Sequence, residues 1–241
     1  MHDRGGVRPR GLLFDYGGTL VEEVAFDVHA GMDVLLANVA HRPPNVSSAS
    51  ILERVDRVGR EVSARRDEYQ IEAPWPAVTR LIYDYFGIRF ARPLDELEVA
   101  FWDASVTTRP MPGAREVLRE LHGSGLPLGV VSNSSCRGAV IRHELTKQGL
   151  AEHLSVVVAS ADYAVRKPNP LLFDTAATLL GVCPSDIWFV GDRLDTDVAG
   201  ARAAGMYPVW FAEPDVTSHG DAELVIGSWH ELLATVRAVG V

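Results

Sequence analysis

The sequence predicts an α/β fold in which a doubly wound parallel sheet is interrupted by an α-helical insert. Three observations support this prediction. An apolar run at residues 11–15 ends in a carboxylate followed by glycines, residues 22–108 are rich in helical patterns, and beyond residue 109 short apolar runs alternate with single amphipathic segments. Strands that alternate with single helices form right-handed crossovers, which produce a parallel sheet covered on both faces.

The first half of the chain supplies one strand and the insert. Residues 11–15 (GLLFD) indicate a buried strand, and the YGGTL that directly follows it indicates a tight turn. Residues 51–69 have a helical period, with an apolar face made of Ile51, Val55, Val58 and Val62. Further helical patterns cover residues 77–86 and 95–104. Strand signals are few in this region, so we expect the insert to be helical.

The second half of the chain alternates regularly. Residues 109–113 (RPMPG) are expected to form a linker that, with the turn after Thr19, acts as a hinge. Strands are expected within 126–132, 154–160, 186–190, 207–211 and 223–227. Helices are expected within 114–125, 136–149, 169–181, 195–205 and 228–239. The prediction is therefore a Rossmann-like α/β core of residues 1–21 and 109–241, with a helical cap domain of residues 22–108.

Composition narrows the functional classes. The formal net charge of −9 disfavours nucleic acid and anionic membranes as partners, because both would repel the chain. The two cysteines, Cys136 and Cys183, form no disulfide framework or zinc motif. No segment approaches the ~20 apolar residues of a membrane span, and the apolar stretch near the N-terminus is too short for a signal peptide. We expect a cytoplasmic protein, and the sequence does not predict its oligomeric state.

Polar side chains gather where the expected strands end. They are Asp15, Ser132, Asn133, Lys167, Asp192 and Asp197. Ligands of doubly wound sheets bind at the carboxyl ends of the strands, so these groups are expected to converge. Paired carboxylates are hard oxygen ligands suited to Mg²⁺, and a lysine beside them can hold a phosphate oxygen. A carboxylate neutralised in this way can attack phosphorus.

Four segments give these residues a specific context. FDYGGTL, VVSNSS, RKPNP and GDRLDTDVAGARAAGM occur in this order, each beside an expected strand or helix. The set resembles the four signature motifs of the haloacid dehalogenase superfamily of hydrolases, over residues 8–20 and 110–230. The helical insert lies where members with a small helical cap of the first type carry it. The resemblance implies the Rossmann-like core, the cap, and Mg²⁺-dependent hydrolysis of a small phosphorylated metabolite.

The resemblance also implies a role for each matching residue. Asp15 corresponds to the nucleophile and to a Mg²⁺ ligand, and the backbone carbonyl of Gly17 corresponds to a second ligand. Asp192 corresponds to the acidic metal ligand, and Asp197 to a supporting acid that acts through water or the lysine.

Three further residues correspond to the phosphate site. Ser132 and the amide of Asn133 match the phosphate-binding pair, and Lys167 matches the lysine that orders nucleophile and phosphate. The implied intermediate is an aspartyl phosphate on Asp15.

The chain departs from the family pattern at Gly17. Most phosphatases of the superfamily have an aspartate at this position, which protonates the leaving group and activates water. General acid–base catalysis contributes about 10²–10⁴-fold, so its loss matters for an ordinary monoester and less for an acyl phosphate. The nearby Glu22, Glu23, Asp27 and His29 are candidates to replace it.

Two alternatives to an active phosphatase stay open. One is a non-catalytic protein that binds phosphate or a partner on the same scaffold. The other is a dehalogenase, which is disfavoured because the metal-type motif GDRLDTD is retained. Phosphonoacetaldehyde hydrolysis is improbable, because it needs a cap lysine and the chain's only lysines are Lys147 and Lys167.

Several other residues have simpler structural interpretations. Thr19 is expected to hold the turn, and Asp195 to stabilise a helix N-terminus. The aromatic residues of the insert are expected to form mainly the core of the cap. An arginine-rich run is expected to be a solvated helix face, with Arg54, Arg57, Arg60, Arg65 and Arg66.

Overall fold

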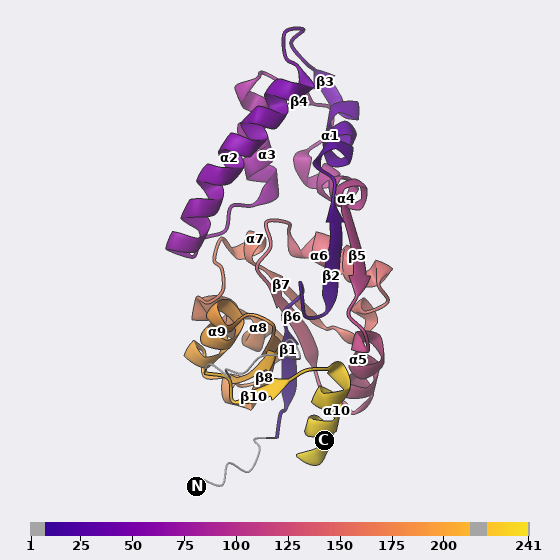
Figure 1. Cartoon of the computed structure of the whole chain (residues 1–241), viewed down its shortest axis with the longest axis vertical. Coiled ribbons are helices and arrows are strands. Elements are labelled where there is room, and N and C mark those ends of the chain that lie inside the picture. Colours follow the sequence, from indigo (N-terminus) through magenta and orange to yellow (C-terminus); the bar gives the residue numbers. More distant parts are fainter. Residues whose placement is uncertain (1–7, 213–220, 241) are drawn as a thin grey trace.

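The computed structural model of the chain describes residues 8–212 and 221–240. Figure 1 shows a parallel sheet in its lower half and a group of helices above it. The six strands of the sheet lie in the order β10-β9-β8-β1-β6-β7, and every neighbouring pair is parallel. Their bounds are β1 Gly11–Phe14, β6 Leu128–Ser132, β7 Val156–Ala159, β8 Ile187–Gly191, β9 Tyr207–Phe211 and β10 Leu224–Ile226.

Helices cover both faces of this sheet. The described helices of the core are α5 Ala114–Gly123, α6 Gly138–Lys147, α7 Ser160–Tyr163, α8 Pro170–Leu180, α9 Ala199–Ala203 and α10 Trp229–Ala238, and short turns occur at Ala151–His153, Pro184–Asp186 and Leu194–Val198. The side chains of Leu12 and Phe14 in β1 pack in one apolar cluster with α5, α6 and α10. The intervening Leu13 packs in a second cluster with α8 and α9. Alternate side chains of a strand point to opposite faces, so the sheet is buried on both sides.

The doubly wound sheet was correctly predicted from the sequence. After β1 the chain adds β6 and β7 on one side, and then β8, β9 and β10 on the other. The order in which strands are added to the sheet reverses at β1, which lies between β6 and β8. In such sheets the switch point brings several strand ends together, and there the predicted polar residues meet.

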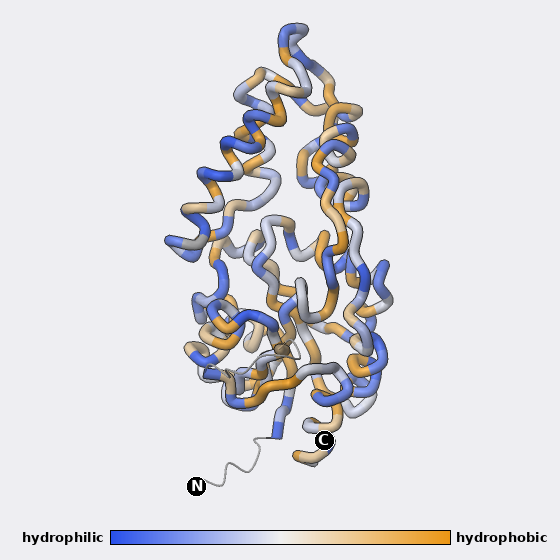
Figure 2. Tube along the Cα trace, viewed as in Figure 1, coloured by the Kyte–Doolittle hydropathy of each residue, from blue (hydrophilic) through white to orange (hydrophobic). Residues whose placement is uncertain are grey.

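Four helices make up most of the insert between β1 and α5. They are α1 Val28–Ala37, α2 Ser48–Tyr69, α3 Trp75–Tyr85 and α4 Leu94–Ser105. Their buried side chains form a separate cluster that includes Ile51 and Val58 of α2. The hydropathy trace in Figure 2 shows α2 as predominantly hydrophilic, with hydrophobic positions at intervals along it. This pattern is the amphipathic period that predicted the helix.

The expectation of a purely helical insert was incomplete. The insert begins and ends in β2 Val21–Phe26 and β5 Val106–Pro110, which pair antiparallel. A smaller pair, β3 Val39–His41 and β4 Arg89–Phe90, lies farther along it. The expected linker at 109–113 was wrong at its first two residues, because Arg109 and Pro110 pair with β2. The ribbon of β2 and β5 joins the helices to the sheet (Figure 1).

The ribbon crosses the boundaries predicted for the two domains. The division into residues 1–21 with 109–241 and residues 22–108 stays a prediction, and its outermost segments lie outside the described residues. Across the described parts of the chain, no helix is long and apolar enough to cross a membrane.

Candidate active site

The turn after β1 places Asp15 and Thr19 at the end of the sheet. The amide of Gly18 donates to the carbonyl of Val21, and the amide of Val21 donates to the carbonyl of Tyr16, both at 2.9 Å. Gly18 has φ +80°, and a Cβ there would lie 2.6 Å from Oδ2 of Asp192. Only glycine fits both the left-handed conformation and this approach. The glycine turn therefore lets two strand ends meet closely.

Lys167 is the centre of the predicted site. Its ammonium group lies 2.5 Å from Oδ1 of Asp15 and 2.6 Å from Oδ1 of Asp197. It also donates to the carbonyl of Val131 at 3.0 Å. Its side chain is 2% exposed, so the ion pairs are sheltered from water. A lysine held by two carboxylates is fixed in position and can face an incoming phosphate.

Burial and charge determine how these groups ionise. Burial raises the pKa of Asp15, and the neighbouring Lys167 opposes this shift. Burial and the charge of Asp15 raise the pKa of Asp197 to about 6, against the opposing effect of Lys167. Burial alone would lower the pKa of Lys167, but the charges of Asp15 and Asp197 raise it. The lysine therefore stays cationic beside its carboxylates.

Ser132 is the last residue of β6, and Asn133 begins the loop that follows it. Ser132 is buried and lines the same cavity as Asp15 and Lys167. The side chain of Asn133 holds the backbone of Lys167: its Oδ1 accepts from the amide of Lys167 at 2.8 Å, and its Nδ2 donates to the carbonyl at 3.0 Å. The Asn133 side chain thus ties the loop after β6 to the segment between α7 and α8, a contact that sequence reasoning did not predict.

The acidic residues could hold a divalent cation. Oxygen atoms of Asp15, Asp192 and Asp197 all lie within 4.8 Å of one another. Burial and the charge of Asp197 raise the pKa of Asp192, which marks an excess of negative charge near it. Among the described residues, no backbone amide donates to the carbonyl of Gly17. This donor set of hard oxygens fits Mg²⁺.

The two carboxylates that follow Asp192 have different surroundings. Asp197 is fully buried, and its Oδ2 accepts from the amide of Arg193 at 3.1 Å. A Cβ at Gly191 would lie 2.5 Å from Asp197, so this glycine is required for close packing. Asp195 lies at the surface and pairs with Arg193 at 2.8 Å. The geometry favours Asp197 over Asp195 as the supporting acid.

A cavity of about 720 Å³ opens beside these groups. The insert and its ribbon contribute part of the wall, with Val21, Glu23, Arg66, Gln70, Trp102 and Thr108. The core contributes the rest, including Arg166 and Arg193. The buried hydroxyl of Tyr16, which also lines the cavity, has no hydrogen-bond partner among the described residues. The cavity is therefore polar and carries charges of both signs.

The candidates to replace an acid at position 17 lie in different places. Glu22 pairs with Arg109 at 2.7 Å on the outside of the ribbon. Asp27 caps α1 by accepting from the amides of His29 and Ala30. Glu23 alone of the four candidates lines the cavity, opposite Thr108 in the register of β2 and β5.

The sequence prediction was wrong for Arg66 of the insert and overlooked Glu72. The arginine-rich run is exposed at Arg57, Arg60 and Arg65, but the expectation was wrong for Arg66, which lines the cavity. Arg66 pairs at 2.8 Å with Glu72, whose side chain is fully buried. An isolated glutamate in a loop carries no motif, so the sequence offered no signal for it.

Comparison with known proteins agrees with this geometry. A family model described as haloacid dehalogenase-like hydrolase matches residues 9–205. The chain therefore belongs to the haloacid dehalogenase-like hydrolases. It is 37% identical over 114 residues to a glyceraldehyde 3-phosphate phosphatase of Methanopyrus kandleri, and this match covers 46% of the chain and 47% of that relative.

Two other curated relatives match different lengths of the chain. A phosphoserine phosphatase of Thermus thermophilus is 36% identical over 115 residues, covering 48% of the chain and 45% of the relative. The chain therefore spans just under half the length of the Methanopyrus and the Thermus relatives. A phosphoglycolate phosphatase of Yersinia pseudotuberculosis is 26% identical over 94% of the chain and 93% of its own length.

Solved structures share the fold. A phosphatase of the same superfamily from Thermococcus onnurineus has a TM-score of 0.62 at 23% identity, over 94% of this chain and 97% of its own. A 2-haloacid dehalogenase from Pseudomonas syringae has a TM-score of 0.63 at 22% identity, over the same shares of the two chains. The fold thus hosts both chemistries, and the site must distinguish between them.

Proposed function

We propose that this chain is a Mg²⁺-dependent phosphatase that hydrolyses a small phosphorylated metabolite through an aspartyl phosphate on Asp15. The observation that carries the proposal is the position of the Lys167 ammonium, between Asp15 and Asp197 in a cavity that Ser132 and Asn133 also line. The names of the phosphatases that the chain resembles support a phosphorylated substrate.

The proposed reaction has two steps. In the first, a carboxylate oxygen of Asp15 attacks phosphorus, and the bond between phosphorus and the leaving oxygen breaks. In the second, water attacks the same phosphorus, which releases inorganic phosphate and restores the carboxylate. Lys167 and Ser132 hold the phosphoryl oxygens during both steps. Asp15, the Gly17 carbonyl and Asp192 would hold Mg²⁺, which supplies neutralising positive charge when bound.

Glu23 is the residue that we propose in place of the missing aspartate. It enters the cavity from the strand that directly follows the nucleophile turn. Its side chain forms no ion pair or hydrogen bond with the described residues, so its carboxyl group is available. It would donate a proton to the leaving oxygen in the first step and accept one from water in the second.

The proposed activity is tested with acetyl phosphate and p-nitrophenyl phosphate, whose leaving groups need little protonation. We expect turnover that requires Mg²⁺ and that falls by at least about 10³-fold in Asp15→Asn, because the nucleophile is lost. Lack of Mg²⁺-dependent turnover, or full activity in Asp15→Asn, would favour the non-catalytic binding protein. Release of halide from a 2-haloacid without metal would favour the dehalogenase.

A further inference from the structure

The loop between α2 and α3 brings a buried carboxylate of the insert against the core. Glu72 in this loop has a side chain with no exposed surface. Its Oε1 lies 2.8 Å from Nε of Arg66 and accepts from the amide of Ala73 at 3.0 Å. Its Oε2 lies 2.5 Å from a terminal nitrogen of Arg166 and accepts from the hydroxyl of Ser160 at 2.6 Å. Each carboxylate oxygen therefore has two partners.

The partners of Glu72 come from both parts of the molecule. Arg66 belongs to α2 of the insert, whereas Ser160 and Arg166 belong to the core. The backbone follows the same path: the amide of Arg166 donates to the carbonyl of Gln70 at 2.9 Å, and that of Glu72 donates to the carbonyl of Ala164 at 3.2 Å. Glu72 is thus the charged centre of a contact between cap and core.

This contact reaches the phosphate site by two routes. Arg166 directly precedes Lys167 in the chain. The hydroxyl of Ser160 also accepts from the amide of Ser134 at 2.9 Å, and Ser134 directly follows Asn133. Glu72 does not line the cavity itself, but both of its arginine partners do.

We propose that Glu72 is a positioning residue for the phosphoryl-transfer site, because its single negative charge holds the cap against the core and fixes Arg66 and Arg166 in the cavity wall. The proposal rests on the proposed function for its kinetic consequence. Without the carboxylate, two largely buried arginines would face each other, with 23% and 14% of their side chains exposed. Like charges left in this position repel, and the cap should separate from the core.

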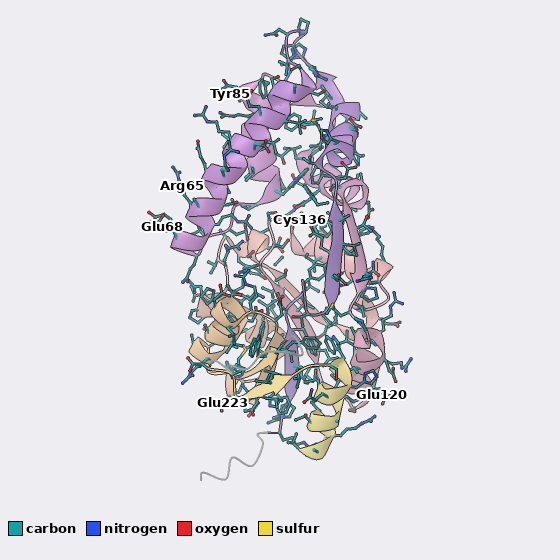
Figure 3. The ribbon with its side chains drawn as sticks, viewed as in Figure 1. Arg65, Glu68, Tyr85, Glu120, Cys136 and Glu223 are labelled. Carbon is teal, nitrogen blue, oxygen red and sulfur yellow. The ribbon has the colours of Figure 1, made fainter. Side chains whose placement is uncertain are left out.

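The kinetic test compares Glu72→Gln with the wild type on acetyl phosphate. A cap that is closed for only a fraction of the time raises the apparent KM by the inverse of that fraction, so we expect KM to rise about tenfold or more with a smaller change in kcat. A loss of folded protein would instead lower kcat and leave KM unchanged. Glu68→Gln is the control, because Glu68 is an exposed carboxylate close in sequence to Glu72 and lies at the outer side of α2 (Figure 3).

A double variant separates the charge from the shape of the side chain. In Arg66→Gln/Glu72→Gln the repulsion between the two arginines is removed. We therefore expect the distance between cap and core, measured with the spin labels described below, to return to that of the parent protein, whereas KM stays raised because Arg66 itself lines the cavity. If the distance in the double variant is as long as in Glu72→Gln or longer, the charge-bridge proposal is overturned.

A distance measurement tests the same proposal without turnover. Spin labels can be attached to the exposed Cys183 of the core and to an Arg60→Cys variant on the exposed face of α2, whereas Cys136 is buried. We expect one narrow distance distribution in the parent protein, longer distances in Glu72→Gln, and recovery in the double variant. An unchanged distribution in Glu72→Gln contradicts the proposal. This arm stands even if the proposed phosphatase activity fails.

Discussion

Gly17 lies where the resemblance of the sequence motifs implies an aspartate. Its Cβ position is open, with no atom within 4 Å, and its φ lies outside the positive range that favours glycine. Nothing in the local backbone therefore requires glycine, in contrast to Gly18 next to it. The space that an acid would occupy faces the cavity, and Glu23 approaches that cavity from β2.

The proposed role of Glu23 predicts a dependence on the leaving group. Glu23→Gln should lower turnover of an alkyl phosphate by about 10²-fold or more, and that of acetyl phosphate much less, because only the alkoxide needs a proton. Adding Gly17→Asp to Glu23→Gln should restore alkyl phosphate turnover. The measurement is kcat/KM for both substrates in each variant. Equal losses on the two substrates would show that Glu23 has another role.

The convergence that the sequence predicted for polar residues near the strand ends is present, whereas the roles of these residues stay proposals. Asp15, Ser132, Lys167, Asp192 and Asp197 meet because the strands are parallel and end at one edge. Glu72 and Arg66 were out of reach for the opposite reason. Their contacts join a loop to distant segments of the core, and no local pattern encodes such tertiary contacts.

At the scale of elements, α6 is tied to the insert by Glu144. This carboxylate is buried, and it accepts from Nε1 of Trp102 at 2.8 Å and from the hydroxyl of Thr108 at 2.5 Å. Lys147 and Gln148 of the core complete its shell. Burial alone would raise the pKa of Glu144, but these four hydrogen bonds lower it to about 2.

The low pKa of Glu144 predicts a pH-dependent stability. Because the folded pKa lies below the ordinary value of 4.5, the stabilisation is full above about pH 4.5 and is lost as pH falls toward 2. Glu144→Gln should reduce the free energy of unfolding by about 2 kcal/mol at neutral pH, after allowance for solvent screening. Urea unfolding at neutral pH and at about pH 3 should show this difference shrinking.

The control for this prediction is Glu120→Gln. Glu120 lies at the surface of α5 and pairs with Arg237 at 2.7 Å, with 39% and 60% of the two side chains exposed (Figure 3). An exposed pair contributes little, so this variant should change stability by under about 1 kcal/mol. A Glu144→Gln effect of the same small size, or one that does not depend on pH, would contradict the assignment.

The elements that the sequence missed share a physical cause. β2 is buried only at Val21 and becomes exposed toward Phe26, so the strand has no continuous apolar face. Strand predictions depend on alternation between a buried and an exposed face, which a two-stranded ribbon between two parts of the molecule does not need. The core strands were predictable because both of their faces are buried and their residues are apolar.

At the scale of the whole molecule, the sheet and the insert have different roles in the proposed chemistry. The sheet brings Asp15, Lys167 and the acidic residues together, and the insert closes the cavity with groups from the ribbon and from α2. In the proposed reaction, closure over the substrate would exclude water from the first step, and opening after the leaving group departs would admit water for the second. Under the proposed function, the wall that the insert contributes would select the substrate, and the core would perform the transfer.

Direct detection of the covalent intermediate tests the central claim. The protein is mixed with Mg²⁺ and acetyl phosphate, quenched in acid, digested and examined by mass spectrometry, with Asp15→Asn treated in the same way. The account predicts one phosphoryl group on the peptide that carries Asp15, removed by hydroxylamine and absent from Asp15→Asn. Hydrolysis of acetyl phosphate with no phosphoryl group on Asp15, or with the group on another residue, would contradict it.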